Sequence, residues 1–140
     1  MSDAELHRLV QAHKAMAHPA RLRILAMLRG GELCACQITA VLQLAPSTIS
    51  AHLADLRRAG LIEERKDGRW VYSVLATSEW ARRLLMPLWE QLPHDPRILD
   101  DARILERLRR VSLEKLCRAD LDLGAVGIEL PVAGVNFEHD

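Results

Sequence analysis

The hydrophobic pattern of this chain changes period near Gly60, and that change constrains the fold more than any other feature. Before Gly60, apolar residues recur three or four positions apart, which is the spacing of amphipathic helices. After it, the run LIEERKDGRWVYSVL places the hairpin turn signal Asp67-Gly68 between two segments of strand-forming residues. The order of helices followed by a β-hairpin predicts a mainly α fold with a hairpin wing, a winged helix-turn-helix.

Capping residues, prolines and glycines divide the chain into segments. Helices are expected over residues 4–17, 20–30, 32–44, 46–59, 77–92 and 97–118. Pro87 lies inside the fifth of these helices and should kink or break it. We therefore expect three parts: a winged-helix domain for DNA binding and dimerisation (1–92), an additional C-terminal helix (97–118) and an acidic tail (119–140).

Charge is distributed unevenly along the chain. The 19 Lys and Arg residues balance 19 Asp and Glu residues, but residues 119–140 hold five acids and no Lys or Arg. Residues 1–118 therefore carry five excess positive charges, and a basic body with an acidic tail indicates a polyanionic partner such as double-stranded DNA. No apolar run is long enough to span a membrane, and no signal peptide is evident, so a cytoplasmic location is expected.

The segment that begins at Pro46 has the composition of a recognition helix, with short polar side chains in its first turns. Its apolar residues at helical spacing should face inward, which would turn the polar side chains toward the major groove. The later arginines of this helix and of the wing would contact phosphates, or the minor groove at the wing tip. The expected DNA contacts are Ser47, Thr48, Ser50, His52, Arg57, Arg58 and Arg69. A symmetric homodimer on an inverted repeat would strengthen this binding.

Two of the three cysteines, Cys34 and Cys36, are one residue apart just before the recognition helix. A thiophilic ion that bridges two thiolates needs their sulfur atoms within about 4.6 Å, twice a metal–sulfur bond. Residues i and i+2 lie about 200° apart around a regular helix, so both thiols cannot face one ion there. Either the segment is not helical at rest, or ion binding unwinds its first turn and moves the adjoining recognition helix.

Four runs resemble the ArsR family of metal-responsive repressors: HPARLRIL, ELCAC, STISAHLADLRRAGLI and DGRWVYSVL. The resemblance covers roughly residues 5–90 and implies a homodimeric winged-helix repressor that pairs through its first and fifth helices. ELCAC is similar to the family's arsenite-binding motif, which implies trivalent arsenic (arsenite, antimonite or methylarsenite) as the inducer. Residues 97–140 are not covered by the resemblance.

The chain departs from the family pattern at two positions. Pro46 stands where family members often carry a Gln, which removes one potential base contact and implies a different operator sequence. Thr39 stands where a complete arsenite site has its third Cys. Cys117, from the same or the partner subunit, is the candidate third ligand, and its alternative role is that of a small buried apolar residue. A site of two thiols would suit a methylated arsenical.

Parts of the sequence also suit other functions. The same cysteines suit a cadmium, lead or zinc sensor, although the histidines lack the spacing of a zinc site. They also suit a redox sensor, in which a disulfide between residues i and i+2 would be strained. A winged helix that binds protein instead of DNA is a further alternative. An enzyme is not expected, because the motifs contain no nucleophile–base pair and no glycine-rich phosphate loop, and no organic cofactor is indicated.

Overall fold

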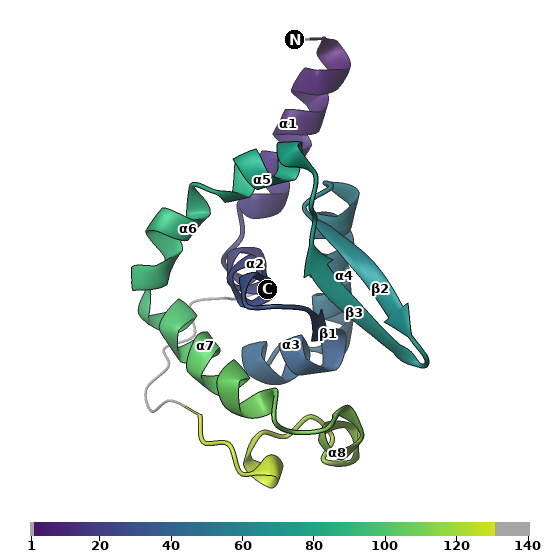
Figure 1. Cartoon of the computed structure of the whole chain (residues 1–140), viewed down its shortest axis with the longest axis vertical. Coiled ribbons are helices and arrows are strands. Elements are labelled where there is room, and N and C mark those ends of the chain that lie inside the picture. Colours follow the sequence, from purple (N-terminus) through teal and green to yellow (C-terminus); the bar gives the residue numbers. More distant parts are fainter. Residues whose placement is uncertain (1, 131–140) are drawn as a thin grey trace.

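The computed structural model describes residues 2–130 and confirms the winged helix-turn-helix prediction (Figure 1). Its elements are α1 (Asp3–Met16), α2 (Pro19–Arg29), β1 (Leu33–Cys34), α3 (Ala35–Leu42), α4 (Pro46–Arg58), β2 (Ile62–Asp67), β3 (Trp70–Leu75), α5 (Glu79–Leu85), α6 (Leu88–Gln91), η1 (Leu92–His94), α7 (Pro96–Leu108), α8 (Leu113–Arg118) and η2 (Gly124–Val126). None of the helices within residues 2–130 is long and apolar enough to cross a membrane.

The wing is the antiparallel pair β2–β3, closed by the tight turn that the sequence predicts. Asp67 pairs with Trp70, and Gly68 takes a φ of +60°, a conformation that favours glycine. The strands lie against α4 with their shared tip directed toward the end of the molecule that carries α8 (Figure 1). The wing thus extends past the recognition helix and reaches the C-terminal part of the chain.

The segment over residues 32–44 differs from its prediction as one helix. Leu33 and Cys34 form the short strand β1, which pairs with Ser73 and Tyr72 of β3 and completes a sheet of order β1-β3-β2. The helix α3 starts only at Ala35, and the side-chain oxygen of Gln37 accepts a hydrogen bond of 2.9 Å from the Cys34 N–H. Leu33 is fully buried, so burial against the sheet outweighs continuation of the helix.

The C-terminal region also differs from its prediction, since residues 97–118 form two helices rather than one. The hydroxyl oxygen of Ser112 accepts a hydrogen bond from the Lys115 N–H and so starts a new helix, α8, after α7 has ended. Beyond α8, Leu123 and Ile128 are buried in the same core as the winged helix. The first part of the predicted tail is therefore packed. The last two acids of the tail, Glu138 and Asp140, lie outside the described residues.

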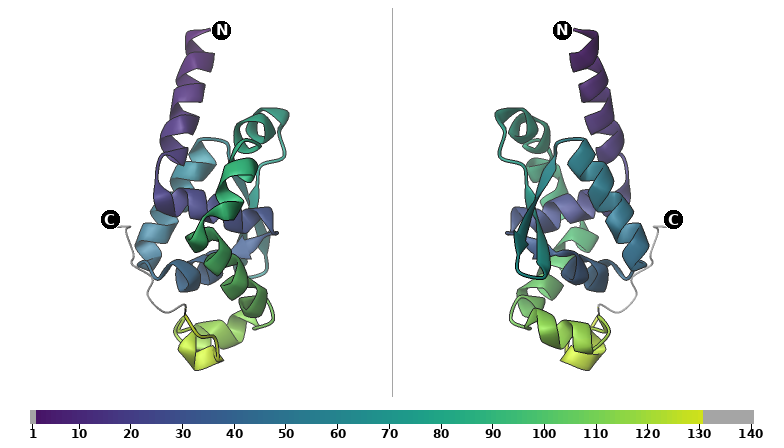
Figure 2. Two further views of the ribbon diagram at one scale, coloured as in Figure 1. Left: turned by 90° about the vertical axis from the view of Figure 1, so that its left-hand side faces the viewer. Right: turned by 90° about the vertical axis from the view of Figure 1, so that its right-hand side faces the viewer.

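The predicted fifth helix breaks at the position of its proline. α5 ends at Leu85, and α6 begins at Leu88, directly after Pro87. α7 then returns across the body, where it packs against α2 and α3. At the opposite end, α1 projects beyond the rest of the molecule, as both side views show (Figure 2). Leu6 and Val10 on α1 keep 53% and 41% of their surface exposed.

Candidate nucleic-acid interface and thiol site

The recognition helix α4 presents its first turn to solvent in the way the sequence predicts. Pro46 occupies its first turn, where a missing N–H costs no helical hydrogen bond. Ser47 and Ser50 are exposed and Thr48 is half-buried. The apolar side of the helix, with Ile49 and Leu56 fully buried, packs into the core. Three of the four predicted polar contacts therefore lie at the surface of this turn.

His52 is the exception, and the prediction that its side chain points outward is wrong. It keeps only 6% of its surface exposed, because it lies three residues after Ile49 and four before Leu56, on the inward side of α4. Its Nδ1 is 3.3 Å from the Nη1 of Arg21, and its ring lies 4.5 Å from the ring of His18. His52 thus belongs to the packing between α2 and α4.

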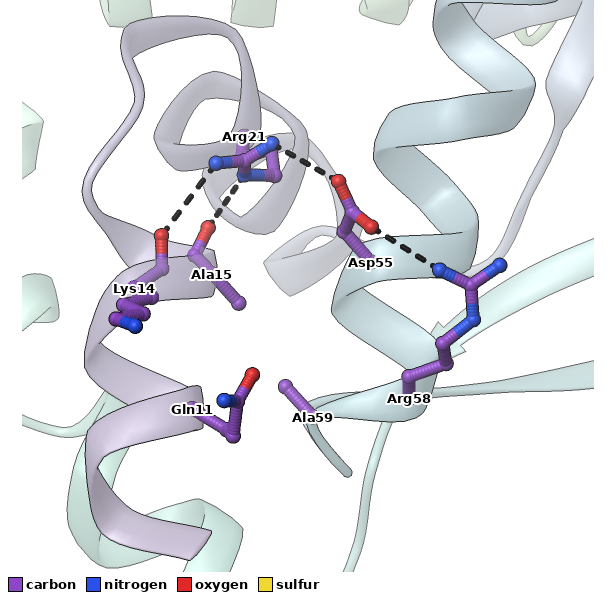
Figure 3. A pocket seen from close by; sticks show the side chains of 7 residues that line it. All are labelled: Gln11, Lys14, Ala15, Arg21, Asp55, Arg58 and Ala59. Carbon is purple, nitrogen blue, oxygen red and sulfur yellow. Dashed lines mark hydrogen bonds and ion pairs between the residues drawn. The ribbon is translucent and has the colours of Figure 1, made fainter. Parts of the chain in front are cut away.

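Arg21, which the sequence reasoning missed, connects three helices beside a cavity of about 300 Å³ (Figure 3). Its Nε donates to the Ala15 carbonyl at the end of α1 (2.6 Å), and its Nη1 donates to the carboxylate of Asp55 on α4 (3.2 Å). The other oxygen of Asp55 accepts from Arg58 at 3.3 Å. These bonds fix the recognition helix relative to α1 and α2. The only sign of this role in the sequence is that Arg21 is a charged residue within an otherwise apolar helix.

The arginines predicted to contact phosphates are exposed, and each has an acidic partner on the protein. Arg57 binds Glu64 of the wing, and Arg58 binds Asp55. Arg69, after the wing turn, lies 3.3 Å from Glu114 of α8. Exposed ion pairs contribute about 0–1 kcal/mol, so a DNA phosphate can replace such a partner at small cost.

The structure brings the thiols of Cys34 and Cys36 together without any ion. Cys34 ends β1 with φ −74° and ψ 149°, an extended conformation, while Cys36 lies in the first turn of α3. The Cys36 thiol donates a hydrogen bond to the Cys34 sulfur, which lowers the pKa of Cys34 to about 6 against the opposing effect of burial. The same hydrogen bond, together with burial, raises the pKa of Cys36. The first of the two geometric alternatives therefore holds: the segment is not a continuous helix at rest.

The surroundings of this thiol pair include the wing. Cys34 is the cross-strand partner of Tyr72, and the N–H of Val71 also donates to its sulfur and favours the thiolate. Cys34 is buried at 6% exposure, and Cys36 is half-buried. An ion at these two sulfur atoms would touch both the first turn of α3 and the middle of β3.

Within residues 2–130, no third donor joins the two thiols. Thr39 is buried, and its hydroxyl donates to the Ala35 carbonyl at 2.8 Å. Cys117, the candidate third ligand, is exposed on α8, a helix that packs against α3, and its charge contributes to raising the pKa of Cys36. Across residues 2–130, no three His, Cys, Asp or Glu side chains are grouped closely enough to hold a metal ion.

Comparisons with known proteins agree with the fold and the motifs. The family model described as "Bacterial regulatory protein, arsR family" matches residues 18–64. The arsenical resistance operon repressor of Escherichia coli is 37% identical over 83 residues, covering 57% of this chain and 71% of the relative. The arsenic resistance transcriptional regulator ArsR1 of Pseudomonas putida is 47% identical over 60 residues, covering 42% of this chain. The match spans about half of that relative's length, 47%.

Solved structures show the same architecture. Reduced HlyU from Vibrio cholerae has a TM-score of 0.53 at 37% identity, covering 64% of this chain and 96% of HlyU. HlyU of that organism is described as a transcriptional activator. The homodimeric winged helix-turn-helix DNA-binding domain of Mb0332 from Mycobacterium bovis has a TM-score of 0.58 at 32% identity, covering 69% of this chain and 94% of that domain.

Proposed function

Because this chain belongs to the ArsR family of bacterial regulatory proteins, we propose that it is a transcriptional repressor that trivalent arsenic releases from its operator. The family and fold are those of DNA-binding transcriptional regulators and not of enzymes. The observation that carries the arsenic assignment is the contact between the thiols of Cys34 and Cys36 at the start of the helix-turn-helix.

In this proposal, two copies of the chain bind an inverted repeat, and each copy inserts α4 into a major groove. Ser47, Thr48 and Ser50 would contact base edges and phosphates from the exposed first turn. Arg57 and Arg58 would contact phosphates, and Arg69 would reach the minor groove beside the wing. The homodimeric state of the Mycobacterium bovis domain supports this arrangement.

The two thiols would bind arsenic as thiolates, which are the soft donors that such an ion prefers. Arsenous acid exchanges one hydroxyl for each thiol, so that each new As–S bond releases one water formed from that hydroxyl and the thiol proton. The low pKa of Cys34 supplies one thiolate near neutral pH. Cys117 on the short surface helix α8 is the proposed third ligand, and a two-thiol site would take a methylated arsenical.

Coordination at these sulfur atoms would disturb the elements that hold the DNA-binding surface together. Cys36 belongs to the first turn of α3, which packs against α4, and Cys34 pairs with β3 of the wing. An ion held by both sulfur atoms would therefore tie the first turn of α3 to β3 and restrict the movement of the two elements relative to each other. The protein would then favour a conformation with lower operator affinity.

The experiment is a fluorescence anisotropy titration of reduced protein with a fragment from upstream of its own gene. We expect micromolar arsenite to release the DNA from the wild type, and Cys34→Ser and Cys36→Ser to bind DNA without responding. Cadmium, lead and zinc, tested in parallel, would identify a sensor of another ion. A complex that persists in arsenite with reduced thiols would contradict the arsenic assignment, and an unchanged response in Cys117→Ser would exclude Cys117 as a ligand.

A further inference from the structure

The helix α1 is held to the rest of the protein mainly at its C-terminal end. Its buried side chains are Ala12, Ala15 and Met16, all of them in the last turns of the helix. Over residues 3–11, only Leu9 is as much as half-buried. The direction in which α1 projects from the body is therefore set mainly by the contacts at this end.

Arg21 on α2 connects this end of α1 to the recognition helix. Its Nε donates to the Ala15 carbonyl at 2.6 Å and its Nη2 to the Lys14 carbonyl at 3.4 Å, while its Nη1 donates to the Asp55 carboxylate of α4 at 3.2 Å. The Arg21 side chain is only 15% exposed, and shielding from water strengthens such bonds. Figure 3 shows α1 and α4 on opposite sides of an open cavity of about 300 Å³, with Arg21 between them. At this cavity, a polar link rather than close packing joins the two helices.

A small tilt of α1 at this end would move its exposed apolar face by the length of one base pair. Leu6 lies nine residues before Ala15, about 13 Å along the helix, so a tilt of about 15° displaces Leu6 by about 3.5 Å. One base pair adds about 3.4 Å to the distance between two half-sites on DNA. The stacking of Arg8 on Trp80 joins α1 to α5, the other predicted dimer helix, and not to α4. In a dimer that pairs through α1, the angle between α1 and α4 therefore decides which half-site spacing both recognition helices can reach at once.

We propose that Arg21 sets the half-site spacing that this protein selects on its operator. The guanidinium holds α1 and α4 at one angle through the Ala15 carbonyl and the Asp55 carboxylate. An operator of another spacing then binds only when these bonds are strained or broken. The inference rests on the DNA-binding part of the proposed function and on the predicted dimer through α1, and it does not depend on arsenic. Arg21 acts through the two helices and not through contact with DNA, so it is a positioning residue.

The test measures affinity by fluorescence anisotropy on a series of inverted repeats whose half-sites are moved apart or together by single base pairs. Loss of a hydrogen bond to a charged group changes an equilibrium constant by about tenfold or more, so we expect the wild type to lose about that much affinity at the spacings next to its best one. In Arg21→Gln this ratio between neighbouring spacings should become severalfold smaller. Arg21→Lys should resemble Arg21→Gln, because a single ammonium group does not reproduce the fork of the guanidinium.

Two substitutions on α4 separate positioning from a loss of phosphate contacts or of stability. Asp55→Asn breaks the same link at a half-buried residue and should flatten the spacing preference as Arg21→Gln does. This variant keeps the test decisive if the Arg21 variants do not fold. Arg58→Gln removes only the exposed partner of Asp55 and leaves the Arg21 bond in place. It should lower the affinity by a similar factor at every spacing, because it removes a proposed phosphate contact.

The possible outcomes are distinct. If the Arg21 and Asp55 variants lose affinity by the same factor at every spacing, the positioning role is overturned and the repressor assignment stands. A wild type that binds all spacings equally would overturn the role as well. If the wild type binds no inverted repeat more tightly than unrelated DNA, the proposed function itself fails and the inference fails with it.

Discussion

Cys34 and Cys36 differ in backbone conformation, and this difference explains how the thiols of two residues so close in the sequence can come into contact. Two positions inside one helix would point their thiols in nearly opposite directions. Here the extended residue Cys34 ends a strand, and Cys36 lies in the helical turn that follows, so the Cys36 thiol reaches the Cys34 sulfur. The spacing of the cysteines predicts a thiol site, but only the pairing of β1 with β3 creates its geometry.

The thiol pair predicts an unusual titration. Because the Cys36 thiol donates to the Cys34 sulfur, the Cys34 thiolate should form as the pH rises through about 6 and be lost as the pH falls below it. In Cys36→Ala the donor is absent, so the pKa of Cys34 should rise toward the ordinary value of about 9. The ultraviolet absorbance of the thiolate, followed against pH, measures both titrations.

Cys117→Ser is the matched control for this titration, because Cys117 is not among the groups that lower the pKa of Cys34. It should keep the transition near pH 6. If Cys36→Ala also kept that transition, the hydrogen bond between the two thiols would not be its cause.

Among the elements, those with strong local signals were predicted and those made by tertiary contacts were not. The turn at Asp67-Gly68 and the apolar spacing in α4 are local, and both the wing and the recognition helix have the expected form. The strand β1 has two residues and exists because β3 lies beside it, which no local pattern shows. The prediction that His52 faces outward is wrong because a histidine can occupy either face of a helix. Its contacts with His18 and Arg21 keep it on the inward face.

The side-chain contacts that the sequence did not indicate join distant segments. Arg21 reaches Asp55 across 34 positions, and Arg69 reaches Glu114 across 45. Each of these residues looks like an ordinary surface charge in the sequence, because its partner is set by the fold. The same holds for the attachment of α7, where Arg23 and Asp101 form a bond of two parallel N–H···O contacts, both 2.8 Å.

The pair that attaches α7 to α2 predicts a large effect on stability. Asp101 keeps 3% of its surface exposed, so Asp101→Asn would leave the charge of Arg23 half-buried without this carboxylate. Breaking a buried pair in this way costs about 3 kcal/mol. We expect the free energy of unfolding, measured in urea, to fall by this amount.

The neighbouring residue Asp100 provides the control for this substitution. Its ion pair with Arg103 lies at the surface, at 3.3 Å, where Arg103 keeps 75% of its side chain exposed. Asp100→Asn should therefore lower the free energy of unfolding by less than about 1 kcal/mol. Equal losses in the two variants would show that burial of the Arg23 pair is not what attaches α7.

At the scale of the whole molecule, the two ends of the structure carry different kinds of side chain. α8 and the wing tip lie at one end, where Arg69, Glu114 and Cys117 line one open cavity. α1 projects at the other end and lies beside α5, since the Arg8 guanidinium is 3.8 Å from the centre of the Trp80 ring (Figure 1). The predicted dimer surface, formed by the first and fifth helices, would thus be separate from the proposed thiol site at β1 and α3 (Figure 1).

The exposed apolar residues of α1 allow a test of the proposed dimer. Leu6 and Val10 are four residues apart, so they share one face of the helix, and a second copy would bury them. Leu6→Glu should convert the dimer to a monomer in sedimentation experiments and weaken operator binding by about 10²-fold or more, because two linked half-sites bind far more tightly than one. Leu99→Glu, at a residue of α7 with 43% exposure, should leave both mass and affinity unchanged. A Leu6→Glu protein that stays dimeric would show that the copies meet through another surface.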